Sequence, residues 1–140
     1  MWGSTKGLFL DKGFNLKISY KPKKYYLPKL AIGLDDFSGT GVFTKEYIVS
    51  TYSLNRIKLS AGIGWGKFVG QENSFTNPLT KLSDRFEKRS IVSKNFNFGG
   101  SPSYDKWFRG DSVFFGGLEV PFGKKKNFSF KLESNPFDYY

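Results

Sequence analysis

Apolar and polar residues alternate strictly along residues 56–66 of the chain. Every odd position carries an apolar side chain, and the even positions from 58 onward carry lysine, serine and glycine. A β-strand sends alternate side chains to opposite faces, so this pattern predicts a strand with one apolar face and one polar or small-residue face. The run is long enough to cross a bilayer at a tilt. We therefore expect the apolar face to contact lipid through Ile57, Leu59, Ala61, Ile63 and Trp65.

Further segments with strand-like patterns lie on both sides of this run. They are residues 14–20, 26–34, 43–52, 112–121 and 128–133. Most of them place apolar side chains on alternate positions, which again indicates a sheet with one apolar face. The alternation within 43–52 is too irregular to assign its outward face.

The connections between these segments alternate between short and long. The short connections are 21–24, 53–55 and 122–127, and the long ones are 35–41 and 67–111. Tight turns at one rim and long loops at the other are typical of transmembrane barrels. We therefore predict an all-β fold, an antiparallel up-and-down meander that is part of a transmembrane outer-membrane β-barrel.

The number of strands bears on how much of a domain the chain represents. About six strands are fewer than the eight of the smallest outer-membrane barrels, and the chain has 140 residues. No basic start followed by an apolar core is visible after Met1, so we expect the signal peptide of an outer-membrane protein to lie outside this sequence. Residues 1–140 are therefore predicted to be a single segment of a larger β-barrel domain, with 67–111 as a long extracellular loop.

Composition narrows the possible functions. The chain has 16 Phe, 8 Tyr, 3 Trp and 16 Gly, which suits an all-β protein with many turns and the aromatic girdles of outer-membrane barrels. It has no cysteine and no histidine, so thiol chemistry is excluded and the usual general base and commonest metal ligand are missing. We therefore expect no enzymatic activity, no metal and no cofactor.

The positive charge of the chain raises the question of an anionic partner. The formal net charge is +10, which is compatible with non-specific anion binding. The densest clusters, at Lys21, Lys23 and Lys24 and at 124–126, fall in short connections rather than on one binding surface. We therefore expect no nucleic-acid partner.

Two loop regions contain candidate ligand-binding residues. Asp35 and Asp36 open a glycine-rich connection, where paired carboxylates can bind calcium or act as acid and base. Their adjacent positions favour a structural turn, since calcium loops space their ligands. Tyr104, Trp107 and Arg109 combine aromatic rings with a cation, which suits sugar stacking and acidic saccharides. An aromatic belt at the membrane interface explains the same residues.

Local features of the long connection and of the central strand complete the pattern. Asn77 followed by Pro78 predicts a capped start of a short helix, with Leu79, Leu82 and Phe86 on one side. Such a helix either packs locally or plugs a lumen, and we favour local packing.

The glycines of 62–66 lie along a strand and not between a strand and a helix, so they do not form a phosphate loop. A wall face packed closely by another segment explains them better.

Several segments taken together resemble one protein family. They occur in the same order over about residues 8 to 134, at 27–41, 46–49, 62–66, 77–79, 83–86, 107–110 and 115–119. The set is similar to the YjbH-like outer-membrane proteins of Gram-negative bacteria, which are linked to exopolysaccharide and capsule biosynthesis. The resemblance implies an outer-membrane location and, as partners, membrane lipid, polysaccharide and other exopolysaccharide-secretion proteins. It brings no catalytic residues.

These observations lead to one expected function and two alternatives. We expect an outer-membrane β-barrel component that supports exopolysaccharide or capsule export or assembly, by passage or tethering of the polymer and not by bond-making. The first alternative is a soluble all-β carbohydrate-binding module. The weaker second alternative is a glycan-acting enzyme that uses Asp35 or Asp36. Saccharide contacts are expected at Asp35, Asp36, Tyr104, Trp107 and Arg109.

Overall fold

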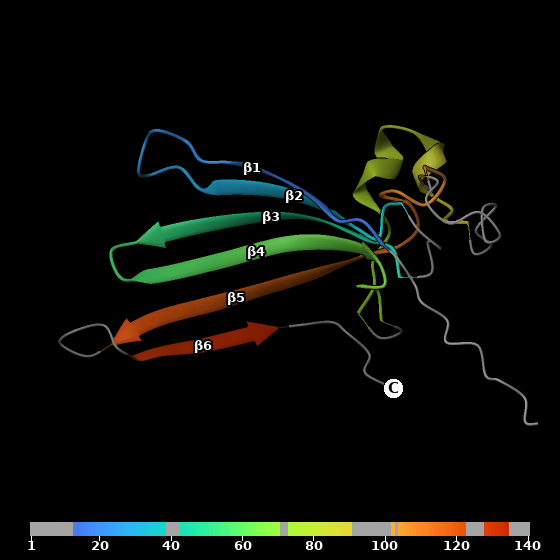
Figure 1. Ribbon diagram of the computed structural model, residues 1–140. Coiled ribbons are helices and arrows are strands. Elements are labelled where there is room, and N and C mark those ends of the chain that lie inside the picture. Colours follow the sequence, from blue (N-terminus) through green and yellow to red (C-terminus); the bar gives the residue numbers. More distant parts are fainter. Residues whose placement is uncertain are drawn as a thin grey trace, which may run out of the picture.

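The protein is built on one six-stranded antiparallel sheet whose strands follow one another in sequence order (Figure 1). A computed structural model describes residues 13–38, 43–70, 73–90, 102, 104–122 and 128–134. The strands are β1 (Leu16–Tyr20), β2 (Lys29–Asp35), β3 (Lys45–Leu54), β4 (Ile57–Gly66), β5 (Ser112–Phe122) and β6 (Phe128–Ser134). The predicted all-β meander is confirmed. Among the described strands β1 and β6 each have a single neighbour, so the sheet is open.

All the predicted strands are present, and their ends shift by a few residues. The largest shift is at the start of β2, which begins at Lys29, and β3 extends to Leu54 because Leu54 still pairs with Ile57 of β4. Only Asn55 and Arg56 then remain for the turn. Asn55 has a φ of 51°, a left-handed conformation that asparagine tolerates better than most residues. The long connection 67–111 is confirmed, since β4 ends at Gly66 and β5 begins at Ser112.

Strand register assigns the outward face of β3, which the sequence pattern left open. Ile48 of β3 pairs with Ile32 of β2 and with Ile63 of β4. Ile32 in turn pairs with Ile18 of β1. Because directly opposed residues share one face of a sheet, these four isoleucines form one row across four strands. The even-numbered side chains of β3 therefore continue the apolar face predicted for β4.

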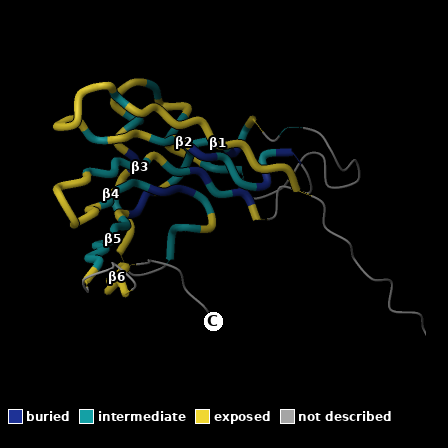
Figure 2. Tube along the Cα trace, turned by 60° about the vertical axis from the view of Figure 1, so that its left-hand side comes forward, coloured by how far each residue is buried: buried dark blue, intermediate teal, exposed yellow. Residues whose placement is uncertain are grey.

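This apolar face extends over all six strands and is mostly uncovered by the described residues. Ile18 is 63% exposed and Leu59 is 54% exposed, and Figure 2 shows β1 and β6 largely in the exposed colour. The exposed large side chains on this face are Leu16, Ile18, Tyr20, Leu30, Ile32, Ile48, Leu54, Ile57, Leu59, Phe114, Phe122, Phe128, Phe130 and Leu132. A contiguous apolar surface of this kind is typical of a face that meets lipid or another apolar layer.

The opposite face combines polar side chains with aromatic rings that lie over glycines. A β-carbon added at Gly62 would overlap the ring of Phe115, and one added at Gly64 would overlap Phe68. The expectation that these glycines are packed closely by other segments is confirmed. Gly66 has a φ of 71°, and a β-carbon added there would overlap the carbonyl oxygen of Thr44, so glycine is needed where the chain leaves β4.

The long connection contains two short 3-10 helices. These are η1 (Pro78–Lys81) and η2 (Asp84–Phe86). The predicted cap is confirmed, because the side-chain oxygen of Asn77 accepts a hydrogen bond from the backbone N–H of Leu79 at 3.0 Å. The predicted helix is not continuous, and Leu82 is 79% exposed instead of packing beside Leu79.

An ion pair joins this connection to the sheet. Glu46 of β3 is 1% exposed, and Arg89 donates to both of its carboxylate oxygens, at 2.7 and 3.0 Å. The same guanidinium donates to the carbonyl of Lys106 at 2.7 Å and to the hydroxyl of Thr44 at 2.6 Å. Bidentate geometry and additional acceptors are what a buried charge pair requires. The pair therefore holds three segments together at one end of the sheet, namely the start of β3, the segment of Arg89 and the segment of Lys106.

Phe108 completes the contact between the connection and the apolar face. Its ring lies edge-on to Trp65 at 5.2 Å, and its backbone N–H donates to Glu46 at 3.2 Å. Its carbonyl accepts from the side chain of Asn77 at 2.8 Å. These contacts hold Phe108 at a φ of 55°, which is strained for a bulky residue. Trp65 is consequently 1% exposed, unlike the lipid-facing position expected for it.

Lys106 lies buried beside this ion pair. Burial lowers the pKa of its ammonium group, and the charge of Arg89 acts in the same direction, while Asp105, Asp36 and Glu46 raise it. A lysine whose folded pKa lies below its unfolded value binds its proton less readily when folded. Protonation of Lys106 therefore opposes docking of the connection, and this opposition is relieved as the pH rises through the lowered pKa.

Replacing Arg89 with methionine should release the connection from the sheet. The change leaves the carboxylate of Glu46 buried without its cation, and breaking a buried pair in this way costs about 3–5 kcal/mol. We expect limited proteolysis to cut within 67–111 much faster than in the parent protein.

Lys88→Met is the matched control, because Lys88 is the adjacent cation in sequence and is exposed. Combining Glu46→Leu with Arg89→Met should restore part of the protection, since no buried charge then remains. Equal protease resistance of the Arg89→Met and Lys88→Met proteins would contradict the role assigned to the ion pair.

Candidate functional site

The two carboxylates singled out in the sequence have separate partners. Asp35, at the end of β2, forms an ion pair with Lys45 of β3 at 3.5 Å. Asp36 has a φ of 52°, and its carboxylate accepts the backbone N–H of Phe43 at 3.2 Å. One carboxylate therefore links two strands, and the other closes the turn between them. The structure does not gather them into one site.

The aromatic residues of the connection lie next to this turn. The rings of Tyr104 and Trp107 are 4.8 Å apart, and Trp107 is edge-on to Phe37 at 6.1 Å. Arg109 follows in the chain, and its backbone N–H donates to the carbonyl of Lys106 at 3.4 Å. The structure thus brings Tyr104 and Trp107 together beside the turn that contains Asp36. A role for these residues in saccharide binding stays a prediction.

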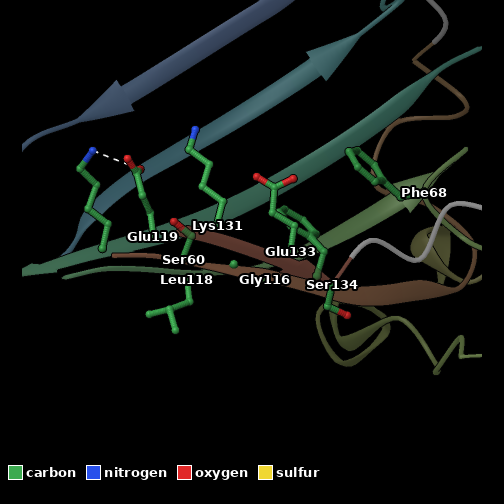
Figure 3. A pocket seen from close by; sticks show the side chains of 11 residues that line it. Ser60, Phe68, Gly116, Leu118, Glu119, Lys131, Glu133 and Ser134 are labelled. Carbon is green, nitrogen blue, oxygen red and sulfur yellow. Dashed lines mark hydrogen bonds and ion pairs between the residues drawn. The ribbon is translucent and has the colours of Figure 1, made fainter. Parts of the chain in front are cut away.

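A hollow of about 350 Å³ lies on the polar face of β4, β5 and β6 (Figure 3). Figure 3 shows the side chains of Glu119, Lys131 and Glu133 on one side of the sheet, while Leu118 points to the other. The polar residues of the lining are Lys58, Ser60, Glu119, Lys131, Glu133 and Ser134, and the rings are Phe68 and Phe115. We call this hollow the wall groove.

The strand register explains why a groove forms at this point. Ser60 of β4 is opposite Gly117 of β5, which is opposite Glu133 of β6. Glycine has no side chain, so the middle of this cross-strand row is empty. Along β5 the residues two positions away, Phe115 and Glu119, have large side chains on the same face. Gly117 therefore forms a low floor between taller neighbours.

Charged side chains of both signs line the groove. Lys58 and Glu119 are opposite each other on β4 and β5, and their charged groups are 3.2 Å apart. Glu119 is also opposite Lys131 of β6. Such exposed ion pairs contribute only about 0–1 kcal/mol to stability, so these side chains are free to exchange partners. With Glu133, the lining holds two ammonium groups and two carboxylates, which balance in charge.

Aromatic rings form one end of the wall groove. Phe68 and Phe115 are stacked, with their ring centroids 5.5 Å apart and an interplanar angle of 10°. Tyr47 lies edge-on to both rings, at 6.0 and 6.4 Å. Phe68 belongs to the start of the long connection. The connection therefore contributes a ring to the polar face, while Phe108 packs against the apolar face.

No local sequence pattern marks the groove or the ion pair as a site. The alternating pattern places Lys58 and Ser60 on the polar face of their strand, but it does not show which residues of other strands meet them. Glu46 and Arg89 are 43 positions apart, and nothing in their immediate neighbourhoods marks them as partners. Only the register and the course of the connection bring these residues together.

The described residues include no cluster suited to a metal ion. Within these residues, no group of three or more histidine, cysteine, aspartate or glutamate side chains could hold a metal ion.

Among the helices that the structure describes, none has the length and apolar character needed to cross a membrane.

Comparison with known proteins provides independent information. The family described as exopolysaccharide biosynthesis protein YbjH, the YjbH family, matches residues 3–140. A protein of Escherichia coli K12 named "Uncharacterized lipoprotein YjbH" is 33% identical over 111 residues, which cover 79% of this chain. The chain spans 15% of the length of that relative. No solved structure matches the chain significantly. Because the family match covers nearly the whole chain, the resemblance noted in the sequence is confirmed, and the chain belongs to the YjbH family of exopolysaccharide biosynthesis proteins.

Proposed function

We propose that this chain is a wall segment of an outer-membrane β-barrel within a longer protein, which supports exopolysaccharide or capsule export or assembly. The observation that carries the proposal is the division of the sheet into two unlike faces. One face exposes large apolar side chains on all six strands, and the other combines charged, hydroxyl and aromatic side chains. A barrel wall needs this division, because lipid meets one face and water the other.

Strand length supports the same proposal. β3 and β4 have 10 residues each and β5 has 11. A strand that crosses a bilayer at a tilt of about 45° needs about 9–11 residues. The central strands therefore have the length that a single membrane crossing requires.

The distribution of side chains along the apolar face also suits a bilayer. The row of isoleucines from Ile18 to Ile63 crosses the face next to the row that contains Glu46 and Trp65. Tyr20, Phe122 and Phe128 lie at the end of the sheet that has the short turns. Aliphatic side chains with aromatic rings toward the strand ends suit the lipid-facing band of an outer-membrane barrel, where aromatic side chains mark the interface.

The comparisons support the biological context of the proposal. The family description names exopolysaccharide biosynthesis, and the relative from Escherichia coli is named a lipoprotein. For this chain we propose membrane lipid, polysaccharide and other components of exopolysaccharide secretion as partners. The role would be passage or tethering of a polar polymer.

We also propose that this segment is not catalytic. Glycosidases place two carboxyl groups about 5–9.5 Å apart across the scissile bond. Asp35 is engaged with Lys45, and Asp36 closes a turn. These separate partners favour structural roles for both residues.

A soluble carbohydrate-binding module remains the second candidate. The wall groove, with its aromatic end and charged lining, is an observation that both candidates accommodate. A soluble module would need another layer of the longer protein to cover the apolar face. The two candidates therefore differ in what lies against Ile18 and its neighbours.

The substitutions Ile18→Arg and Ser19→Arg should have unequal effects on the full-length protein. The two residues are adjacent, exposed and on opposite faces of β1. An arginine on the lipid face at the bilayer midplane costs about 2–4 kcal/mol, whereas one on the polar face meets water. We expect Ile18→Arg to reduce the fraction of protein that folds into lipid vesicles, measured by protection from protease, and Ser19→Arg to leave it unchanged. Equal folding yields for the two proteins would count against a lipid-facing surface.

Single cysteines should report opposite sides of the membrane for the turns and the long connection. The sequence has no cysteine, so a label can be placed at Lys23 or Asn55 in the turns, and at Leu82 or Lys88 in the connection. We expect a membrane-impermeant maleimide to label Leu82→Cys and Lys88→Cys in intact cells. Lys23→Cys and Asn55→Cys should react only after the outer membrane is permeabilised. A mixed result within either pair would argue against the proposed topology.

A further inference from the structure

We propose that the wall groove on β4, β5 and β6 binds a neutral saccharide unit of the polymer. This inference rests on the proposed function in one respect, since it takes the polymer to be a polysaccharide. It adds a site, a chemical class of ligand and the residues that contact it. The groove is distinct from the loop residues Tyr104 and Trp107, which lie beside the turn at Asp36.

The chemistry of the lining matches the two kinds of surface that a sugar ring presents. The C–H groups of a pyranose form an apolar patch that packs on an aromatic ring, and Phe68 and Phe115 provide rings at one end of the groove. The hydroxyl groups of a sugar both donate and accept hydrogen bonds. The carboxylates of Glu119 and Glu133 accept them, and the ammonium of Lys131 donates.

The charge of the groove selects a neutral sugar over an acidic one. Two lysines and two glutamates line it, so their formal charges cancel. A uronic acid or a pyruvylated sugar would gain from the lysines but would be repelled by Glu119 and Glu133. Charged groups that already alternate across the strands can instead turn toward sugar hydroxyls, because their exposed ion pairs are weak.

The shape of the groove also suits a single unit of a polymer. Its volume of about 350 Å³ falls in the range of small-molecule sites, about 300–1,000 Å³. The low floor at Gly117 lets a ring approach the backbone between Ser60 and Glu133. Among the described residues the groove is uncovered, and it lies on the polar face of the sheet, which would face the water-filled interior of the proposed barrel.

The test is oligosaccharide binding by the purified full-length protein in lipid nanodiscs. The probe is a printed array of neutral hexose and pentose oligosaccharides, with oligogalacturonate and alginate fragments as acidic comparisons. We expect binding to neutral members of the array only. Binding confined to the acidic members, or to none, would overturn the inference.

Groove variants then locate the binding site. Glu133→Gln and Lys131→Gln should each weaken binding about tenfold or more, as expected when a hydrogen bond to a charged group is lost. Gly117→Val should weaken binding by filling the floor while every polar group remains. Lys17→Gln is the matched control, because Lys17 is an exposed lysine of the polar face on the distant strand β1. If Tyr104→Ala abolishes binding while the groove variants retain it, the site is on the connection and the inference is wrong.

Two further readouts separate this inference from the proposed function. Folding of each variant is checked by protease protection, and its location by membrane fractionation. A protein that resides in the outer membrane and binds sugar equally well with every groove variant would refute the groove and leave the barrel proposal intact. A protein that is soluble but loses sugar binding in the groove variants would refute the barrel and leave the groove intact.

Discussion

Backbone pairing between β3 and β4 is the constraint on which the other features of the structure depend. The two strands pair continuously from Lys45 opposite Gly66 to Leu54 opposite Ile57. Because side chains alternate between the faces, a slip of one residue would move every side chain of one strand to the wrong face. The row of isoleucines would then be broken, and Glu46 would leave its place opposite Trp65. The division into an apolar and a polar face therefore follows from this register.

Glu46 is the one acidic residue that this register places on the apolar face among the described strands. An unpaired carboxylate there would be costly to desolvate, and Arg89 supplies the cation together with a set of hydrogen bonds. A buried ion pair adds little net stability compared with an apolar pair, but it accepts only one arrangement of its partners. It therefore specifies where the long connection docks.

The long connection is in contact with both faces of the sheet. Phe68 packs on Gly64 of the polar face, and Phe108 packs on Trp65 of the apolar face. The connection thus encloses the end of β4, where neighbouring residues point in opposite directions. Glycine has two roles on the polar face, because it leaves room for rings at some positions and leaves the floor of the wall groove open at Gly117. The packing of Phe68 on the sheet and the shape of the wall groove therefore both depend on small residues on the polar face of β4 and β5.

The sequence alone determined the features that depend on neighbouring residues. Period-two alternation located most of the strands, the lengths of the connections indicated the meander, and Asn77 before Pro78 indicated the cap, because each of these is a local property of the chain. The tertiary structure alone decided the outward face of β3, the burial of Trp65, the partnership of Arg89 with Glu46 and the composition of the wall groove. These depend on register and on contacts between residues far apart in sequence, such as Lys58 and Glu119, 61 positions apart. A local pattern places a side chain on a face, but only the pairing of strands determines which other side chains it meets there.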